Sequence, residues 1–238
     1  MQILPTGEQS FLKIRQNNLL YVDKTEYAYR LIESNPFCFL SRPRRFGKSL
    51  FLSMLKEIFL GKKHLFEGLF IYDKIDWQEY PVIFMDFSLM DFKSLGLENA
   101  IHQRLDEIAQ YYAIEFTKDS MGSKFKELLG KLHEKTGQQV VILIDEYDKP
   151  ITEYLEDKQK ASAQRDILKT FYSIIKGSSE HIRFFFLTGI SRFSKVSIFS
   201  DLNNLTDLTF HEEYNTICGY TPQELEAYFG ERMEKAAQ

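Results

Sequence analysis

The chain has 238 residues, which suits one large α/β domain or a domain with a small appendage. Hydrophobic residues make up 44% of it and 21 residues are phenylalanine, so a substantial core is expected. The formal net charge of −4 gives no support to constitutive, non-specific nucleic-acid binding, although residues 42–48 form a local basic patch.

The two cysteines, Cys38 and Cys218, are too few for a disulfide framework or a zinc cluster, and they fit a reducing compartment. The first residues lack the charged and apolar regions of a signal peptide. No apolar stretch approaches the length of a membrane span. We therefore expect a cytoplasmic protein without a membrane partner.

Residues 1–36 are predicted to be a leader and a helix that pack on the core. Tyr27, Leu31 and Ile32 follow helical spacing, and a proline at position 36 ends the helix. Tyr21 and Lys24 precede the first strand, where many nucleotide-binding domains cover the adenine. A packed N-terminal helix is the favoured interpretation of this segment.

The next stretch has the order strand, loop and helix. An apolar run at 37–41 leads into a basic loop, then into Gly47-Lys48-Ser49, then into helical spacing up to residue 59. The first N–H groups of such a helix bind phosphate, and Gly47 lets the backbone come close. Lys48 would reach the β- and γ-phosphates, and the Ser49 hydroxyl would bind Mg²⁺.

The candidate nucleotide-binding residues of this loop are Arg42, Arg44, Arg45, Phe46, Gly47, Lys48, Ser49 and Leu50. The usual pattern is G-x-x-x-x-G-K-[ST], and Arg42 occupies its first glycine position. The alternative is an exposed basic turn that caps a core strand.

A second strand is expected at 81–88, followed by helices around 97–112 and 125–132. The aliphatic run at 139–144 then predicts a central strand that is buried on both faces. It ends in Asp145 and Glu146, and two acids there are costly to bury without a partner. In a P-loop ATPase, Asp145 would hold Mg²⁺ and Glu146 would orient and deprotonate the attacking water. The alternative is an ordinary strand that runs into an acidic turn.

A long helix around 167–175 precedes another buried strand at 183–189. Thr188, near its end, is the candidate sensor of the γ-phosphate or of the attacking water. Arg192 is the candidate cation that balances phosphate charge, because its planar fork matches phosphate geometry. Lys195 is interpreted as a solvated loop residue. One more strand is expected within 203–210, and a capping box at Thr221 predicts a last helix.

Together these elements predict a three-layer P-loop NTPase with a mostly parallel central sheet flanked by helices. The candidate site has two half-sites, the loop with Gly47-Lys48-Ser49 and the strand end with Asp145 and Glu146. The extra strand at 82–87 lies between them along the chain, which indicates the additional-strand, catalytic-glutamate type. The expected organisation is a leader at 1–36, an ATPase core at 37–211, and a C-terminal helix at 212–238 that begins a missing lid or second module.

The segments 21–25, 42–49, 144–150 and 187–205 also resemble the AAA-ATPase-like family of bacterial proteins. The resemblance extends from about residue 4 to residue 220, and an arginine at the first glycine position belongs to that family's loop. It implies binding of ATP and Mg²⁺, and hydrolysis. Family members typically carry a C-terminal domain similar to restriction-endonuclease-like nucleases. This chain ends before such a domain, so nuclease activity is not expected of it.

Two functions of different classes follow from this sequence. The first is Mg-dependent ATP hydrolysis coupled to a protein partner or an appended module; a role with nucleic acid is open but is not supported by the net charge. The alternative is a nucleotide-dependent switch with little or no turnover. A small-molecule kinase is a weaker third interpretation, because the sequence indicates neither an acceptor pocket nor a lid. No motif distinguishes ATP from GTP.

Overall fold

The computed structural model describes residues 2–34, 36–191, 202 and 204–236. Its centre is a five-stranded sheet whose neighbouring strands all run parallel. The strands are β1 (Phe37–Ser41), β2 (Val82–Asp86), β3 (Val140–Asp145), β4 (Ile182–Gly189) and β5 (Thr206–Asp207). Each lies within or overlaps a stretch that the sequence predicts to be a strand, so the α/β fold with a parallel sheet is confirmed.

The strands lie in the order β2-β3-β4-β1-β5. This order refines the prediction about the extra strand. Along the chain β2 lies between the two half-sites, but in the sheet it lies at an edge, and β4 is the strand between β1 and β3. Sequence neighbours are often, but not always, neighbours in a sheet. Chain order therefore did not reveal which strand separates the two half-sites.

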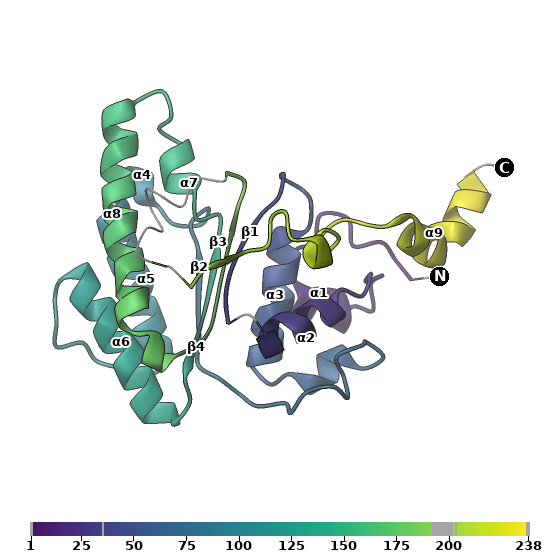
Figure 1. Ribbon diagram of the computed structural model, residues 1–238, viewed down its shortest axis with the longest axis horizontal. Coiled ribbons are helices and arrows are strands. Elements are labelled where there is room, and N and C mark those ends of the chain that lie inside the picture. Colours follow the sequence, from purple (N-terminus) through teal and green to yellow (C-terminus); the bar gives the residue numbers. More distant parts are fainter. Residues whose placement is uncertain (1, 35, 192–201, 203, 237–238) are drawn as a thin grey trace.

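Helices cover both faces of the sheet (Figure 1). One face carries α1 (Phe11–Gln16), α2 (Thr25–Ser34) and α3 (Lys48–Phe59). The other face carries α4 (Phe92–Leu95), α5 (Leu97–Tyr111), α6 (Met121–Thr136), α7 (Lys149–Thr152) and α8 (Lys158–Gly177). Short 3₁₀ helices lie at η1 (Lys63–Phe66), η2 (Ser179–His181) and η3 (Glu212–Tyr214). The two faces pack into two separate hydrophobic clusters.

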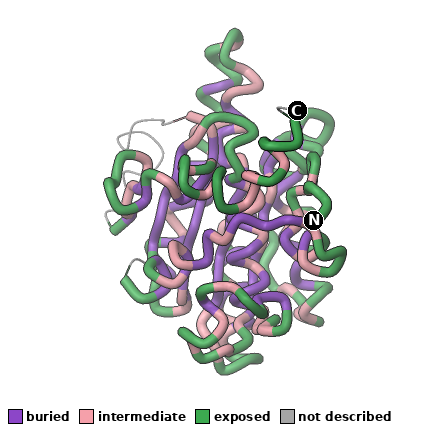
Figure 2. The backbone as a smooth tube through the Cα atoms, turned by 90° about the vertical axis from the view of Figure 1, so that its right-hand side faces the viewer, coloured by how far each residue is buried: buried purple, intermediate pink, exposed green. Residues whose placement is uncertain are grey.

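Strand alternation decides which side chains meet α3. In β3, Val141 and Leu143 belong to the cluster of α1, α2 and α3, whereas Ile142 and Ile144 belong to the opposite cluster. Side chains alternate between faces with a period of two. Asp145, the next residue of β3, therefore belongs to the face of α3. Figure 2 shows the same core as a buried interior with exposed outer turns.

Two helix ends carry recognisable sequence signals. Gly137 ends α6 in a left-handed conformation with φ +69°, which suits glycine. The last helix is α9 (Pro222–Ala236), and it begins with the predicted capping box: Thr221 Oγ1 accepts from the Glu224 N–H at 3.1 Å, and Glu224 Oε2 accepts from the Thr221 N–H at 2.7 Å.

Although α9 is a regular helix, it contains no buried residue and stands away from the layered body, on the side where the N-terminus lies (Figure 1). None of the helices in the described ranges combines the length and the apolar character needed to cross a bilayer.

Candidate functional site

Residues 42–47 form a loop between the carboxyl end of β1 and the first turn of α3. Arg45 and Gly47 have positive φ values of 63° and 95°. Left-handed residues in such a turn point successive N–H groups into a concavity that binds anions. Gly47 is also the N-cap of α3, and no side chain caps that helix. The first N–H groups of α3 are thus left to a ligand, and the helix dipole favours an anionic one.

Lys48 places a cation inside the same loop. Its side chain is buried, with 5% of the residue exposed, and its Nζ donates a 3.0 Å hydrogen bond to the Pro43 carbonyl oxygen. An ammonium without a carboxylate partner in the described structure is costly to bury. The loop is therefore suited to a ligand that brings negative charge.

A row of polar side chains crosses three neighbouring strands opposite this loop. Asp86 ends β2 and is aligned with Asp145 of β3. One step beyond the Ile144–Leu187 pair, Asp145 stands beside Thr188 of β4, which in turn is aligned with Leu40 of β1. Strand alternation places Asp86, Asp145 and Thr188 on the face of α3. The row lies at the carboxyl edge of the sheet, the edge at which the loop begins.

Asp145 is 2% exposed. Burial raises the pKa of its carboxyl to about 6, and the negative charge of Asp86 adds to that rise. Hydrogen bonds from the Ser49 hydroxyl and from the Glu146 N–H, the latter 3.0 Å from Oδ1, oppose it. The structure thus brings Ser49 and Asp145 together. Sequence reasoning did not single out Asp86 as a site residue, although an acid at the end of a buried strand was the available signal.

Thr188 is fully buried, and its Oγ1 has no hydrogen-bond partner in the described structure. A buried polar atom of this kind costs free energy until it is paired. Ser49, Asp145, the uncapped start of α3 and the Thr188 hydroxyl together form a donor and acceptor set that fits a phosphate with its magnesium ion. Within the described ranges, no group of three or more His, Cys, Asp or Glu side chains is arranged to hold a metal by itself.

Glu146 has a left-handed backbone with φ +50° and is half-buried. The next two residues bind the end of β4. The Tyr147 hydroxyl donates to the Ser191 carbonyl oxygen at 2.8 Å. The Asp148 carboxylate, 1% exposed, accepts from the N–H of Ile190 at 3.1 Å and of Ser191 at 2.5 Å. Sequence reasoning took Asp148 as a continuation of an acidic turn and missed this role.

The remaining loop residues have different surroundings. Arg42 donates to backbone carbonyl oxygens, among them Thr209 O at 2.7 Å and Tyr214 O at 3.2 Å. Arg44 and Arg45 are exposed. Phe46 is 46% exposed, and Leu50 packs against the core cluster of α3. Arg192 and Lys195 lie outside the described residues.

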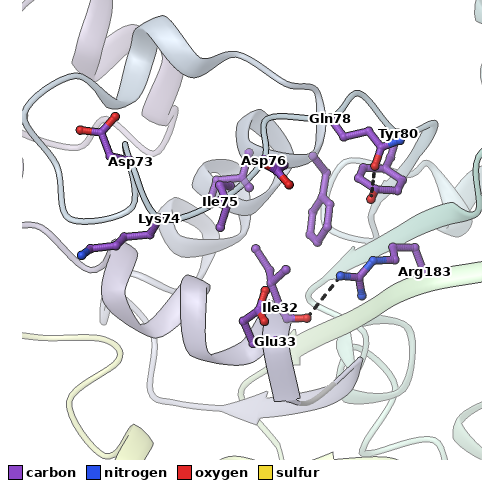
Figure 3. Close-up of a pocket in the computed structure, with 11 residues that line it drawn as sticks. Ile32, Glu33, Asp73, Lys74, Ile75, Asp76, Gln78, Tyr80 and Arg183 are labelled. Atoms are coloured by element: carbon purple, nitrogen blue, oxygen red, sulfur yellow. Dashed lines mark hydrogen bonds between the residues drawn. The ribbon is translucent and has the colours of Figure 1, made fainter.

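Two cavities in the described part of the chain lie elsewhere. One of about 400 Å³ is lined by residues that include Ile32, Asp76 and Arg183 (Figure 3). Arg183 is near the start of β4, so this cavity is at the opposite edge of the sheet from the loop. The other lies between the end of α5 and the start of α6. Neither cavity includes a residue of the polar row or the loop.

A parallel α/β sheet whose first strand runs through a Gly-Lys-Ser loop into a helix is consistent with the class of P-loop NTPases. Residues 5–199 match the model of a family described as "Predicted AAA-ATPase", and the chain belongs to this AAA-ATPase-like family.

An uncharacterized protein from the 5′ region of vnfD in Azotobacter chroococcum mcd 1 is 44% identical over 235 residues. The alignment takes in 97% of this chain and 45% of that protein, so the chain spans about half the length of this relative. No solved structure matches the chain.

Proposed function

We propose that the chain binds Mg-ATP at residues 42–50 and hydrolyses it. The observation that carries this proposal is the polar row that faces the start of α3, in which the buried Thr188 Oγ1 lacks a partner. An unpaired buried hydroxyl costs about 1–3 kcal/mol, and a phosphate oxygen or an ordered water beside it would remove that cost. The family match supports the same conclusion.

The phosphates would lie against the N–H groups of Gly47 and the first turn of α3. Lys48 would exchange its bond to Pro43 for the β- and γ-phosphate oxygens. Ser49 and Asp145 would hold Mg²⁺, which when bound neutralises charge between the β- and γ-phosphates. Arg44, Arg45, Phe46 and Leu50 complete the proposed cradle.

For the chemical step, we assign to Glu146 the orientation and deprotonation of the attacking water. Thr188 would contact the γ-phosphate or that water. We retain Arg192 as the proposed cation that balances charge in the transition state. The order of strands, with β4 between β1 and β3, supports the additional-strand, catalytic-glutamate type.

A second candidate is a nucleotide-dependent switch with little or no turnover. One observation favours it: no hydrogen bond from another described residue holds the Glu146 carboxylate, and its backbone is left-handed. A general base needs a fixed position near the water from which it takes a proton. Under this alternative, binding of the nucleotide would be the functional event.

Glu146→Gln separates the two candidates. Under the first, purified parent protein hydrolyses Mg-ATP, and the variant binds Mg-ATP as the parent does but loses about 100-fold or more of the turnover, the usual contribution of a general base. Glu156→Gln, at an exposed turn, is the matched control and retains parental turnover.

Binding by the parent without turnover would instead select the switch. Parental turnover in Glu146→Gln would remove Glu146 from the mechanism, and a parent that binds no Mg-ATP would overturn the proposal.

We further propose that hydrolysis drives a protein partner or an appended module. The relative's additional length supports this, because it leaves room for such a module. We keep the division into a leader at 1–36, a core at 37–211 and a C-terminal segment at 212–238 as a proposal. Nucleic acid as the partner has no support from the net charge of −4.

A further inference from the structure

The loop's first residue, Arg42, is bound to a distant segment of the chain. We call residues 209–219 the strap. The Arg42 guanidinium donates to Thr209 O at 2.7 Å and to Tyr214 O at 3.2 Å, both in the strap, and also to Ser41 O at 3.0 Å. A planar guanidinium can serve several acceptors at fixed angles, which a lysine cannot do. The side chain at the first glycine position therefore holds the strap by its backbone.

The other end of the loop contacts the strap as well. The Gly219 N–H donates to the Phe46 carbonyl oxygen at 3.1 Å. Gly219 has φ +78°, and a Cβ there would lie 3.5 Å from the Phe46 ring. A side chain at position 219 would be strained in this backbone conformation. The strap thus contacts the loop both where the loop begins and just before α3.

Cys218, which precedes Gly219 in the strap, is buried in the hydrophobic cluster of α3. It is 7% exposed, and burial raises the pKa of its thiol to about 11. The positive charges of Arg42 and Lys48 oppose that rise, and the negative charge of Asp145 adds to it. Movement of the strap away from the loop would expose this thiol.

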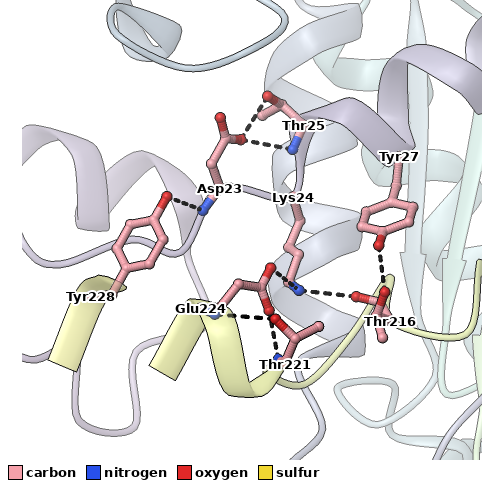
Figure 4. A network of polar contacts seen from close by, with 8 residues as sticks. All are labelled: Asp23, Lys24, Thr25, Tyr27, Thr216, Thr221, Glu224 and Tyr228. Carbon is pink, nitrogen blue, oxygen red and sulfur yellow. Dashed lines mark hydrogen bonds and ion pairs between the residues drawn. The ribbon is translucent and has the colours of Figure 1, made fainter. Parts of the chain in front are cut away.

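The strap continues into α9 through a network of polar contacts (Figure 4). Lys24 Nζ donates to Thr216 O of the strap at 2.9 Å and to Glu224 Oε1 of α9 at 2.6 Å. The Tyr27 and Thr216 hydroxyls form a hydrogen bond, and the Tyr228 hydroxyl accepts from the Asp23 N–H at 3.4 Å. Because α9 contains no buried residue, its position depends on polar contacts and not on core packing; these include a further hydrogen bond from Arg232 to the Gln2 carbonyl oxygen.

We propose that Arg42 is a positioning residue, which holds the phosphate loop against the strap and thereby couples nucleotide binding to the position of α9. This inference rests on the proposed function. Phosphate binding fixes the loop backbone, and the strap is hydrogen-bonded to that backbone and to Arg42. A loop that is fixed by ligand favours the docked strap, and by thermodynamic linkage a docked strap favours ligand binding.

Hydrogen exchange of α9 tests the coupling, with Mg-ATP binding measured separately by calorimetry. In the parent, saturating Mg-ATP slows exchange of the α9 amides by about fivefold or more, the lower end of typical coupling. It also slows alkylation of Cys218 relative to Cys38, which is buried in β1 and reports global unfolding. In Arg42→Ala, Cys218 reacts faster without nucleotide, and Mg-ATP no longer protects α9.

Arg104→Ala is the matched control, because Arg104 also donates to a backbone carbonyl oxygen, Phe84 O at 2.8 Å, but lies on α5 away from the strap. It retains the protection of α9 by Mg-ATP. Glu224→Ala removes the acceptor of Lys24 Nζ on α9 and leaves the contacts of Arg42 intact. It therefore keeps Mg-ATP binding and the protection of Cys218 but loses the protection of α9. This variant decides the matter if Arg42→Ala fails to fold.

Mg-ATP binding by the parent without any change in α9 exchange would overturn the coupling and leave the proposed function standing. The coupling would equally be wrong if Arg42→Ala or Glu224→Ala bound Mg-ATP and kept the protection of α9. A parent that binds no Mg-ATP would overturn the coupling and the proposed function together.

Discussion

At Gly189, at the end of β4, the structure leaves no room for a Cβ atom. A Cβ at this position would lie 2.4 Å from Asp148 Oδ1 and 2.6 Å from the Tyr147 ring. Both neighbours are buried, and both hold the turn after β4 by hydrogen bonds to residues 190 and 191. Glycine is required here by close approach of Tyr147 and Asp148, the residues that follow Glu146.

We therefore expect Gly189→Ala to destabilise the protein by about 1–3 kcal/mol, the usual cost of overpacking. Urea unfolding measures this. Gly130→Ala is the matched control, because Gly130 lies inside α6 and a Cβ there meets nothing within 4 Å. That change should stabilise the protein by up to about 1 kcal/mol, since alanine is the better helix former. Equal effects of the two substitutions would contradict this account.

The sequence predicted part of the arrangement around these residues. The succession of strand, loop and helix along the chain predicts that Gly47, Lys48 and Ser49 lie at a helix start. Because parallel strands end at one edge of a sheet, it also predicts that the carboxylate at the end of β3 lies at the same edge. The contacts of Arg42 were not predictable in this way. Its partners Thr209 and Tyr214 lie 167 and 172 residues away in the sequence, and no local pattern encodes them.

Among the elements, the long helices and the buried strands follow directly from hydrophobic periodicity. The short helices α1, α4 and α7 do not, because 4–6 residues are too few to show a helical period. The strand order was also not predictable from the sequence. β1 pairs with β4, although two other strands lie between them along the chain. The face on which each strand residue lies was predictable once the strand bounds were known.

Glu127 of α6 holds residues 117–118, which precede that helix, against it by hydrogen bonds. Its carboxylate forms an ion pair with Lys131 at 2.8 Å and accepts from the N–H groups of Thr117 and Lys118 at 3.0 and 3.1 Å. The Lys131 ammonium and these donors lower the pKa of Glu127 to about 2, below its ordinary value of 4.5. A lowered pKa contributes stability above pH 4.5 that is lost as pH falls toward 2.

Glu127→Gln should accordingly lower the urea midpoint at pH 7, and its difference from the parent should shrink as the pH is lowered from 4.5 to 3. Glu134→Gln is the control, because Glu134 is an exposed residue in the last turn of the same helix. Loss of a negative charge there is neutral or slightly stabilising, as the helix dipole disfavours it. A deficit for Glu127→Gln that stays constant down to pH 3 would count against the role of its charge.

At the scale of the whole molecule, the strap and α9 contribute very differently to the core. Leu208, just before the strap, and Tyr214, Ile217 and Cys218 within it are buried in the same cluster as α3, whereas α9 contributes no buried residue. Within the proposed C-terminal segment at 212–238, Tyr214, Ile217 and Cys218 thus pack on the core and α9 does not. We expect a stability boundary near residue 220.

Removal of residues 222–238 should change the melting temperature by only about 1–2 °C, because surface changes cost about 0.5 kcal/mol or less in a chain of this size. Removal of residues 208–238 also deletes these four buried side chains, of which the larger are worth about 1.5–3 kcal/mol each, and should lower the melting temperature by about 10 °C or more. Calorimetry of the two shortened chains measures both. Similar losses for the two would place α9 within the folding unit.

The position of β4 between β1 and β3 also dictates when the site can form during synthesis. The strand that leads into the proposed phosphate loop is among the first parts of the sheet to be made, at residues 37–41, yet in the described sheet it pairs with residues 185–189 and 206–207, which are made much later. Until those residues emerge, the β2–β3 pair and β1 have no strand to join them. Such distant pairing is slow and leaves strand edges open. The nascent chain must keep a basic loop and an apolar strand edge unpaired until residues 185–189 have emerged, and the proposed phosphate site can form only after that.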